Sequence, residues 1–361
     1  MLTGTSIVEI EGLGPGPFAA MMLADLGAEV ICVQRPEGPP LPGLPPRNLL
    51  DRGKRTIALD LKSPEDRVIL NALIRRADAL IEGFRPGVME RLSLGPTDCH
   101  ALNPKLVYGR MTGWGQDGPR AREAGHDLNY IALSGALWYG SPPGEPPFTP
   151  PTLLGDIGGG ALYLVAGILA GLLNAARSGS GTVVDAAIVD GSAHMMALLM
   201  SLQAGGLFQT TRGESLLDGP HWSRSYQCAD GGFLSVQCLE PRFYAAFLAL
   251  LNLTNDPDFA RQMDPDTWPK ASGRLTALFA SQSRDHWTAL FAGSDACVAP
   301  VLSPKEAAND PHLIARQTWV QTEGMLQPRA APRFDGHATT PNPAPSRDQH
   351  RAEILADLGL A

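Results

Sequence analysis

The sequence predicts an α/β fold, in which a mostly parallel sheet is covered by helices on both faces, followed by a smaller α+β domain. Strand-like and helix-like segments alternate up to about residue 206, a pattern typical of parallel sheets. The alternation then stops, and a hairpin with several short helices follows. A chain of 361 residues is also more typical of two domains than of one.

Six short apolar runs in the first part predict the strands of the sheet. Each is rich in Val, Ile, Leu or Ala and is bounded by turn residues or by a helical pattern. The expected strands are 5–11, 28–34, 56–61, 79–84, 105–112 and 181–190.

Helices are expected between these strands. Residues 17–27 form one, with a proline in its first turn. Ser63 is the expected N-cap of another, with Pro64 at its first position. A third is expected over 192–206. It carries Met195, Met196 and Met200, which are either soft walls for a fatty acyl chain or ordinary core packing.

One uncharged run, 157–176, is long enough to cross a membrane. It opens with three glycines, lacks an aromatic belt and is followed by a strand pattern, so we expect a helix buried between the sheet and a partner subunit. The N-terminus lacks the basic region of a signal peptide. We therefore expect no membrane partner.

The second part predicts a hairpin over 225–239, three helices at 241–252, 270–282 and 284–293, and a strand at 297–303 that returns to the first domain. The proline-rich stretch 327–347 is expected on a surface. The resulting domains are a large domain (1–206), a linker (207–224), a small domain (225–300) and a return segment with the C-terminal part of the large domain (301–361).

Composition excludes several classes of function. A net charge of −8 provides no basic field for nucleic acid. The five cysteines lack C-x-x-C spacing, and their odd number indicates reduced thiols in the cytoplasm. His, Cys and Asp do not cluster at metal-ligand spacing, so no metal is expected.

The glycine-rich turn "GLGPGP" (12–17) lies where dinucleotide-binding folds hold a pyrophosphate, but its spacing is poor and its prolines remove two amide donors. Arg35 ends the second strand. An arginine there suits the ribose phosphate of NADP or coenzyme A, although this feature taken alone is better explained by a tight turn with a surface arginine.

Further basic residues favour a polyphosphate ligand. They are expected at strand ends of the same sheet in a chain that is acidic elsewhere. These residues are Arg52, Lys54, Arg55, Lys62, Arg85 and Arg91.

The segment "AGHDLNYIALSGAL" (124–137) places His126 and Asp127 at the start of an apolar stretch. Two interpretations are open. The pair is either a polar helix cap followed by core residues, or it includes an imidazole placed to transfer a proton. Asp127 is a candidate to orient the His126 ring.

Several long motifs occur in the order typical of one family. They include "RGKRTIALDLK", "EGFRPGVMERLSLGP", "AGHDLNYIALSG" and "GDIGGGALYLVAGILAGL". The chain thereby resembles the family III CoA-transferase (CaiB/BaiF) superfamily, and within it the α-methylacyl-CoA racemases. The resemblance implies a Rossmann-like large domain, a small domain, and an interlocked homodimer that uses acyl-CoA as substrate without a further cofactor.

The resemblance also assigns site residues. The catalytic residues it implies are His126, Asp156 and Glu240. The CoA-binding residues it implies are Arg35, Leu59, Asp60, Leu61, Lys62, Gly83, Phe84, Arg85, Arg91, Gly125, His126, Asp127, Leu128, Asn129 and Tyr130.

Inversion of a thioester α-carbon through an enolate needs a base and an acid on opposite faces. His126 and Asp156 are expected to fill these roles, with the free amides of the helix that follows supporting the enolate oxygen. Because that helix start favours an ionised Asp156, a second carboxylate is needed to keep a proton there, and Glu240 is the candidate. Without the resemblance, Asp156 and Glu240 read as helix N-caps.

Two alternatives stay open. In a CoA-transferase of the same superfamily, Asp156 is instead the nucleophile that forms an acyl-aspartyl anhydride. A non-catalytic or NADP-binding protein explains Arg35 but not the motifs around His126 and Asp156. The bulky pair His221 and Trp222 leaves the acyl specificity open among branched fatty, sterol and aryl-propionyl groups.

Overall fold

The computed structural model describes residues 1–38, 48–337 and 339–361, and these residues form two compact units. The first unit comprises Met1–Leu137, Thr149–Met195 and His312–Ala361. The second comprises Trp138–Phe148 and Met196–Pro311. Compared with the small domain expected from the sequence, the second unit also takes in 138–148 and 196–224 and extends to Pro311.

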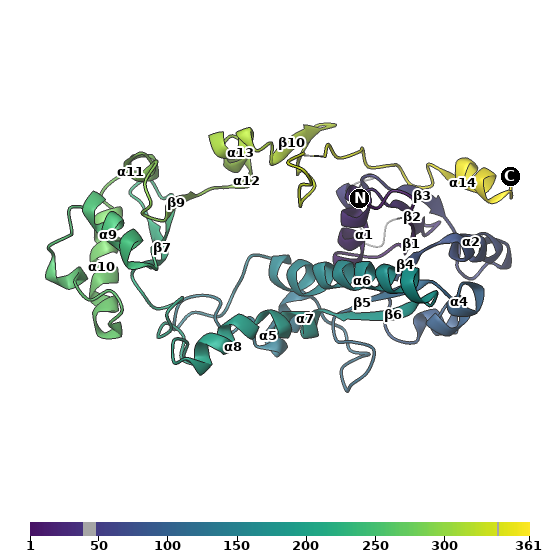
Figure 1. The fold of residues 1–361 in the computed structure, drawn as a ribbon, viewed down its shortest axis with the longest axis horizontal. Coiled ribbons are helices and arrows are strands. Elements are labelled where there is room, and N and C mark those ends of the chain that lie inside the picture. The colour runs from purple at the N-terminus through teal and green to yellow at the C-terminus, as the bar shows by residue number, and fades with distance from the viewer. Residues whose placement is uncertain (39–47, 338) are drawn as a thin grey trace. The chain divides into compact units, whose positions relative to one another are not determined.

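The first unit is built on a six-stranded parallel sheet with the order β3-β2-β1-β4-β5-β6 (Figure 1). This order reverses direction between β1 and β4, and ligands of such sheets bind at the carboxyl ends of the strands at that point. The strands are β1 (Ser6–Ile10), β2 (Glu29–Gln34), β3 (Arg55–Ala58), β4 (Ala79–Glu82), β5 (Val107–Thr112) and β6 (Thr182–Ala187).

Both faces of the sheet are covered because successive strand residues point to opposite sides. Ile7 of β1 packs in a cluster with helices α1 (Pro15–Asp25) and α6 (Leu162–Ser178). Val8, the next residue, packs in a second cluster with α2 (Pro64–Arg76), α4 (Pro96–Leu102) and α14 (Arg351–Leu358). The predicted parallel α/β architecture is therefore confirmed.

Local signals place the helix starts. Ser63 caps α2 by accepting a hydrogen bond from the Asp66 N–H at 3.3 Å, as predicted. Helix α1 begins at Pro15, two residues earlier than expected, after Gly14, whose φ is positive (64°). Further α-helices described in this unit are α3 (Val88–Arg91), α5 (Asp127–Ser134) and α7 (Ile188–Met195), with α13 (Pro311–Ala315) at the boundary.

The glycine-opened apolar run begins as a π-helical segment, Leu153–Ala161, which continues into α6. Among the described residues, Leu153–Ser178 has the length and composition of a membrane span. One face of α6 packs on the sheet, because Gly109 of β5 leaves room for Leu164 and Ile168. Leu162 and Leu173 are exposed on its other side, so within this chain the helix is buried on one face.

The helix expected over 192–206 is two helices. The chain turns helical directly after β6, at Ile188, and α7 ends at Met195. Helix α8 (Ala197–Ala204) follows in the second unit.

The second unit contains an antiparallel sheet of β7 (Ser223–Gln227), β8 (Phe233–Gln237) and β9 (Val298–Val301), together with the helices α9 (Pro241–Leu250), α10 (Trp268–Phe279), α11 (Arg284–Phe291) and α12 (Pro304–Ala307). The predicted hairpin and its helices are confirmed. The strand expected over 297–303 does not return to the large sheet: β9 pairs with β8, with Val298 opposite Val236.

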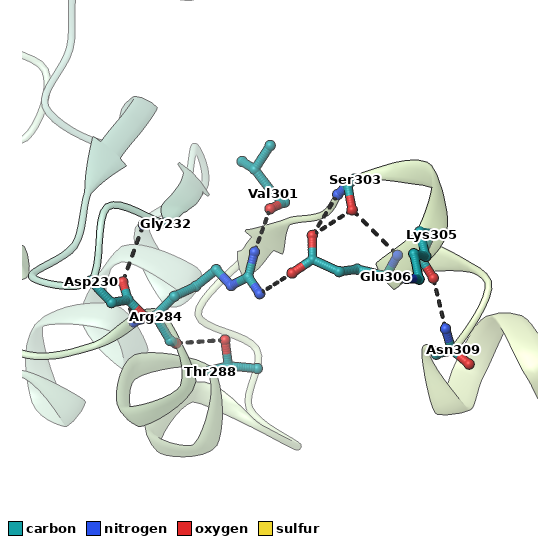
Figure 2. A network of polar contacts seen from close by, with 9 residues as sticks. All are labelled: Asp230, Gly232, Arg284, Thr288, Val301, Ser303, Lys305, Glu306 and Asn309. Atoms are coloured by element: carbon teal, nitrogen blue, oxygen red, sulfur yellow. Dashed lines mark hydrogen bonds and ion pairs between the residues drawn. The ribbon is translucent and has the colours of Figure 1, made fainter.

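Arg284 ties the second unit together where the hairpin turn, α11 and β9 meet (Figure 2). Its backbone N–H donates to both Asp230 carboxylate oxygens, at 3.2 and 3.1 Å. Its guanidinium donates to the Val301 carbonyl at 3.1 Å and to Glu306 Oε1 at 2.5 Å. Ser303 and Glu306 form a capping box at the start of α12.

The C-terminal part of the chain returns to the first unit. It includes a hairpin of β10 (Trp319–Thr322) and β11 (Met325–Pro328). Residues 346–351 then lie along the open edge of β3: the Thr56 N–H donates to His350 Nδ1, and the His350 N–H donates to the Thr56 carbonyl, both at 3.1 Å. This contact covers an edge that would otherwise present unpaired backbone groups.

Candidate functional site

A cavity of about 760 Å³ opens at the carboxyl ends of β1 and β4, the point where the strand order reverses. It lies wholly in the first unit. Eight of the residues predicted to form the site line it: Arg35, Gly83, Phe84, Arg85, Gly125, His126, Tyr130 and Asp156.

Asp156 lies in the first turn of the π-helical segment and faces the glycine-rich turn after β1. A Cβ on Gly14 would stand 3.5 Å from its Oδ2. That distance is an ordinary van der Waals contact, so it is the positive φ of Gly14 that favours glycine at this position.

His126 is the N-cap residue of α5, and its side chain is exposed at the cavity. Its backbone N–H donates to Asn129 Oδ1 at 3.0 Å, which fixes the start of the helix. Asp127 is buried and points elsewhere: its Oδ1 accepts the Asp156 N–H at 2.8 Å. The hydrogen bond of Asp127 therefore positions Asp156, and the expectation that Asp127 orients the His126 ring is not supported.

The pKa of Asp156 is raised to about 6, first by burial and then by the negative charge of Asp127, while His126 acts in the opposite direction. Asp156 can consequently hold or release a proton near neutral pH. The carboxylate that helps it to keep a proton within this unit is Asp127. Glu240, to which the sequence assigned that task, is the exposed N-cap residue of α9 in the second unit.

Two amides at the start of the π-helical segment are already engaged. The Asp156 N–H donates to Asp127, and the Ile157 N–H donates to the Thr152 carbonyl at 3.0 Å. The expectation that free amides here support an enolate oxygen therefore does not hold for these two groups.

Aromatic side chains form one wall of the cavity. Trp114 and Tyr130 meet edge to face with their ring centroids 4.7 Å apart. The Tyr130 hydroxyl donates to the Gly125 carbonyl. A Cβ on Gly113 would lie 1.9 Å from the Tyr130 ring, so only glycine leaves room for this arrangement.

A buried carboxylate beneath the loop after β4 was missed by the sequence analysis. Glu82 accepts the Phe84 N–H at 2.7 Å and pairs with Arg110 Nε at 3.0 Å, while Arg110 also binds Glu90 at 2.8 Å. Burial raises the pKa of Glu82 to about 7. These contacts hold the backbone of the loop that carries Phe84 and Arg85.

The other predicted CoA-binding residues do not line the cavity. Leu59 is buried in the core, Asp60–Lys62 form the turn after β3, and Arg91 is exposed on α3. Leu128 and Asn129 are exposed on the first turn of α5, where Asn129 acts as a capping partner.

Three predicted phosphate-binding cations form internal ion pairs instead. Arg52, Lys54 and Arg55 precede or begin β3, and so lie toward its amino end. Arg52 pairs with Asp25 at 2.5 Å, Lys54 with Glu9 at 2.6 Å, and Arg55 with Glu29 and Asp357 at 2.7 Å each.

Glu9, Cys32 and Asp51 place atoms of the metal-ligating kind within 4.8 Å of one another. The ammonium group of Lys54 also lies there, 2.6 Å from Glu9 and 3.5 Å from Asp51, and supplies the positive charge that a cation would bring. The donor set therefore does not argue for a metal.

His221 and Trp222 are fully buried in the second unit's own core. Their bulk is explained by packing in that core. Met195 packs against Gly158 of the π-helical segment, whereas Met196 and Met200 belong to the second unit.

Residues 2–351 match the family model of CoA-transferase family III. Over 366 residues, the chain is 40% identical to alpha-methylacyl-CoA racemase from Mus musculus, with all of this chain and 94% of that protein covered. The racemase from Homo sapiens is also 40% identical, over 365 residues, with the same shares covered.

A transferase relative and a solved structure extend the comparison. Acetyl-CoA:oxalate CoA-transferase from Acetobacter aceti is 29% identical over 351 residues, which cover 92% of this chain and 89% of that protein. The crystal structure of a CAIB/BAIF family protein from Brucella suis superimposes with a TM-score of 0.83 at 27% identity, over 99% of both chains.

Proposed function

This chain belongs to CoA-transferase family III, and we propose that within the family it is a racemase of α-methylacyl-CoA thioesters. The structural observation that carries the proposal is the pairing of His126 with Asp156 in one cavity, where the pKa of Asp156 is raised to about 6. A racemase needs two groups that both gain and lose protons near neutral pH.

The proposed substrate fits the charges around the cavity. Arg35 and Arg85 bring two guanidinium groups to its lining, at the ends of β2 and β4. Guanidinium groups bind phosphate oxygens in a fixed, bidentate geometry. We assign the phosphates of CoA to these arginines and the thioester end to the region of His126 and Asp156.

In the proposed mechanism one residue removes the α-proton as the other returns a proton to the opposite face. His126 takes the proton from one epimer, and the bonding electrons move into the enolate of the thioester. Protonated Asp156 then delivers its proton to the α-carbon, which yields the other epimer, a protonated His126 and an ionised Asp156. Exchange with water resets both groups. In the reverse direction the roles are swapped.

The test is incubation of a single 2-methylacyl-CoA epimer in deuterated water. The racemase predicts deuterium at the α-carbon, appearance of the other epimer, and no acyl transfer to an added carboxylate. The transferase alternative predicts an Asp156 anhydride that hydroxylamine traps. Acyl transfer without α-deuterium would refute the racemase proposal.

The proposal extends to the setting in which the enzyme works. We expect an interlocked homodimer that acts on acyl-CoA without a bound cofactor, metal, nucleic acid or membrane partner. The net charge of −8 opposes nucleic-acid binding, and the five unpaired cysteines suit a reducing cytoplasm. Sedimentation of a stable, active monomer would contradict the proposed dimer. A thermal shift with NADP but not with CoA would contradict the assignment of CoA as the ligand.

A further inference from the structure

Glu11 follows β1 at the rim of the cavity and interacts with Arg35. Its Oε2 accepts the Arg35 backbone N–H at 2.9 Å and lies 3.9 Å from the Arg35 Nε. The Glu11 side chain is 11% exposed, and that of Arg35 is 51% exposed. A carboxylate in this position competes with any anionic ligand for the Arg35 guanidinium, because both offer oxygen acceptors to the same N–H groups.

Arg347, 336 residues further along the chain, binds both partners. Its Nη2 donates to Glu11 Oε1, and its Nη1 donates to Glu11 Oε2 at 3.4 Å. The same Nη1 donates to the Arg35 carbonyl oxygen at 2.6 Å. Arg35 is thus held by its N–H through Glu11 and by its carbonyl through Arg347, while its own guanidinium remains half exposed.

The segment that carries Arg347 is fixed to the sheet independently of these contacts. The Asp348 N–H donates to Gln34 Oε1 at 3.1 Å, and Asp348 Oδ1 accepts the Ala58 N–H at 2.7 Å. Because Gln34 and Ala58 end β2 and β3, Arg347 approaches Glu11 from an anchored backbone.

We propose that Arg347 is a positioning residue for acyl-CoA binding. By neutralising Glu11 and holding the Arg35 main chain, it leaves the Arg35 guanidinium available to a phosphate of CoA. This inference rests on the proposed function, since it takes Arg35 to be a CoA ligand. It extends the set of residues that determine acyl-CoA binding to Arg347, which belongs to the C-terminal segment and does not itself line the cavity.

The first experiment is steady-state kinetics of Arg347→Ala. We expect KM for the acyl-CoA substrate to rise roughly tenfold, the scale of one lost charge-assisted contact, with kcat within about twofold of wild type. Arg347→Lys keeps a charge near Glu11 but loses the bidentate geometry, so its KM should lie between the two.

The decisive variant combines Arg347→Ala with Glu11→Gln. If Glu11 captures Arg35 once Arg347 is gone, removing the Glu11 charge should lower KM again toward the wild-type value. Gln retains an oxygen that accepts the Arg35 N–H. A merely structural tie predicts the reverse, because a second lost ion-pair partner would weaken the site further.

Arg55→Ala is the matched control, since it removes an ion pair between β3 and α14 without touching Glu11 or Arg35. Its KM should match that of wild type. An unchanged KM in Arg347→Ala, or a higher KM in the double variant, overturns this inference alone. A wild-type protein that does not bind CoA in calorimetry overturns the proposed function and this inference with it.

Discussion

Two histidines in the two units show how environment decides what one side chain can do. His126 is exposed beside the cavity of the first unit, at the N-cap of α5. His221 is fully buried in the second unit, where its Nε2 lies 2.7 Å from the Tyr244 hydroxyl. That hydroxyl donates to the Phe259 carbonyl at 3.0 Å, so it must accept from His221, whose Nε2 therefore carries a hydrogen.

The difference is that His126 is open to water at the cavity, whereas His221 is sealed in a core. Burial lowers the pKa of His221 to about 4, with a smaller contribution from Arg224. Its Nδ1 has no hydrogen-bond partner among the described residues. A histidine of this kind stabilises a core and does not transfer protons, so the two residues should fail in different ways when they are replaced.

The largest effect is expected for His126→Ala. Inversion of a 2-methylacyl-CoA should slow by about 10²–10⁴, the usual contribution of one acid–base group. Because the side chain is exposed, the thermal midpoint should stay close to that of wild type. Chiral analysis of the product and calorimetry of the same sample check both parts. If His126→Ala instead lost stability and kept its activity, His126 would stabilise the fold, as His221 does, and would not transfer protons.

The complementary variant is His221→Ala. It should cost about 2–5 kcal/mol of unfolding free energy, as large-to-small core substitutions do. Once folded, the variant should retain its chemistry. Chemical denaturation of the full chain measures the first quantity, and activity at low temperature measures the second. A fully stable but inactive His221→Ala would contradict the claim that His221 only stabilises the core.

The pH dependence of stability gives a second test of His221. Its pKa in the folded protein, about 4, lies below the ordinary value of 6.5. Between these pH values the unfolded chain takes up a proton that the folded chain does not, so stability falls as pH drops from 6.5 to 4. Replacement of His221 by Leu should remove this contribution. Denaturation midpoints of both proteins at pH 7 and pH 5 check it, and an equal pH dependence in both would contradict it.

Gly113→Ala should have an intermediate effect on the cavity wall. The added Cβ would collide with the Tyr130 ring at 1.9 Å, and such overpacking costs about 1–3 kcal/mol. The displaced ring should lower kcat as well as stability, because Tyr130 shares the cavity with Asp156. Gly118→Ala is the matched control for a second glycine after β5. A Cβ there meets no atom within 4 Å, so this variant loses stability only through its positive φ, and its kcat should match that of wild type.

The smallest effect is expected for Asp127→Asn. The amide oxygen still accepts the Asp156 N–H, but the negative charge that helps to raise the pKa of Asp156 is gone. In the direction where Asp156 is the base, wild-type activity should rise as pH increases through about 6. In Asp127→Asn this rise in activity should occur at lower pH. An unmoved profile would show that burial alone sets the pKa of Asp156.

The sequence predicted those features that depend on neighbouring residues. The six strands, the Ser63 cap and the hairpin over 225–239 follow from local patterns, and each is present. The partner of the strand over 297–303 was predicted wrongly. The alternation in Val298–Val301 marks a strand but carries no information about which sheet it joins.

The site was predicted only in part, because local motifs identify single residues but not the distant residues that contact them. His126 and Asp156 stand in distinctive motifs, and the fold places both on one cavity. The contacts that tune them link residues far apart in the chain: Asp127 with Asp156 over 29 positions, and Arg347 with Glu11 over 336. Arg52 and Lys54 were wrongly predicted to bind phosphate. They precede β3 and therefore lie at its amino end, and the sequence alone does not show at which edge of the sheet the ligand binds.

The central claim is that His126 and Asp156 serve opposite faces of one α-carbon. The most direct measurement is α-deuterium incorporation from deuterated water into each 2-methylacyl-CoA epimer separately, by His126→Ala and by Asp156→Asn. We predict that each variant loses inversion but still exchanges the epimer whose proton the remaining residue removes, so that the two variants exchange opposite epimers. Exchange of the same epimer by both variants would contradict the two-face mechanism.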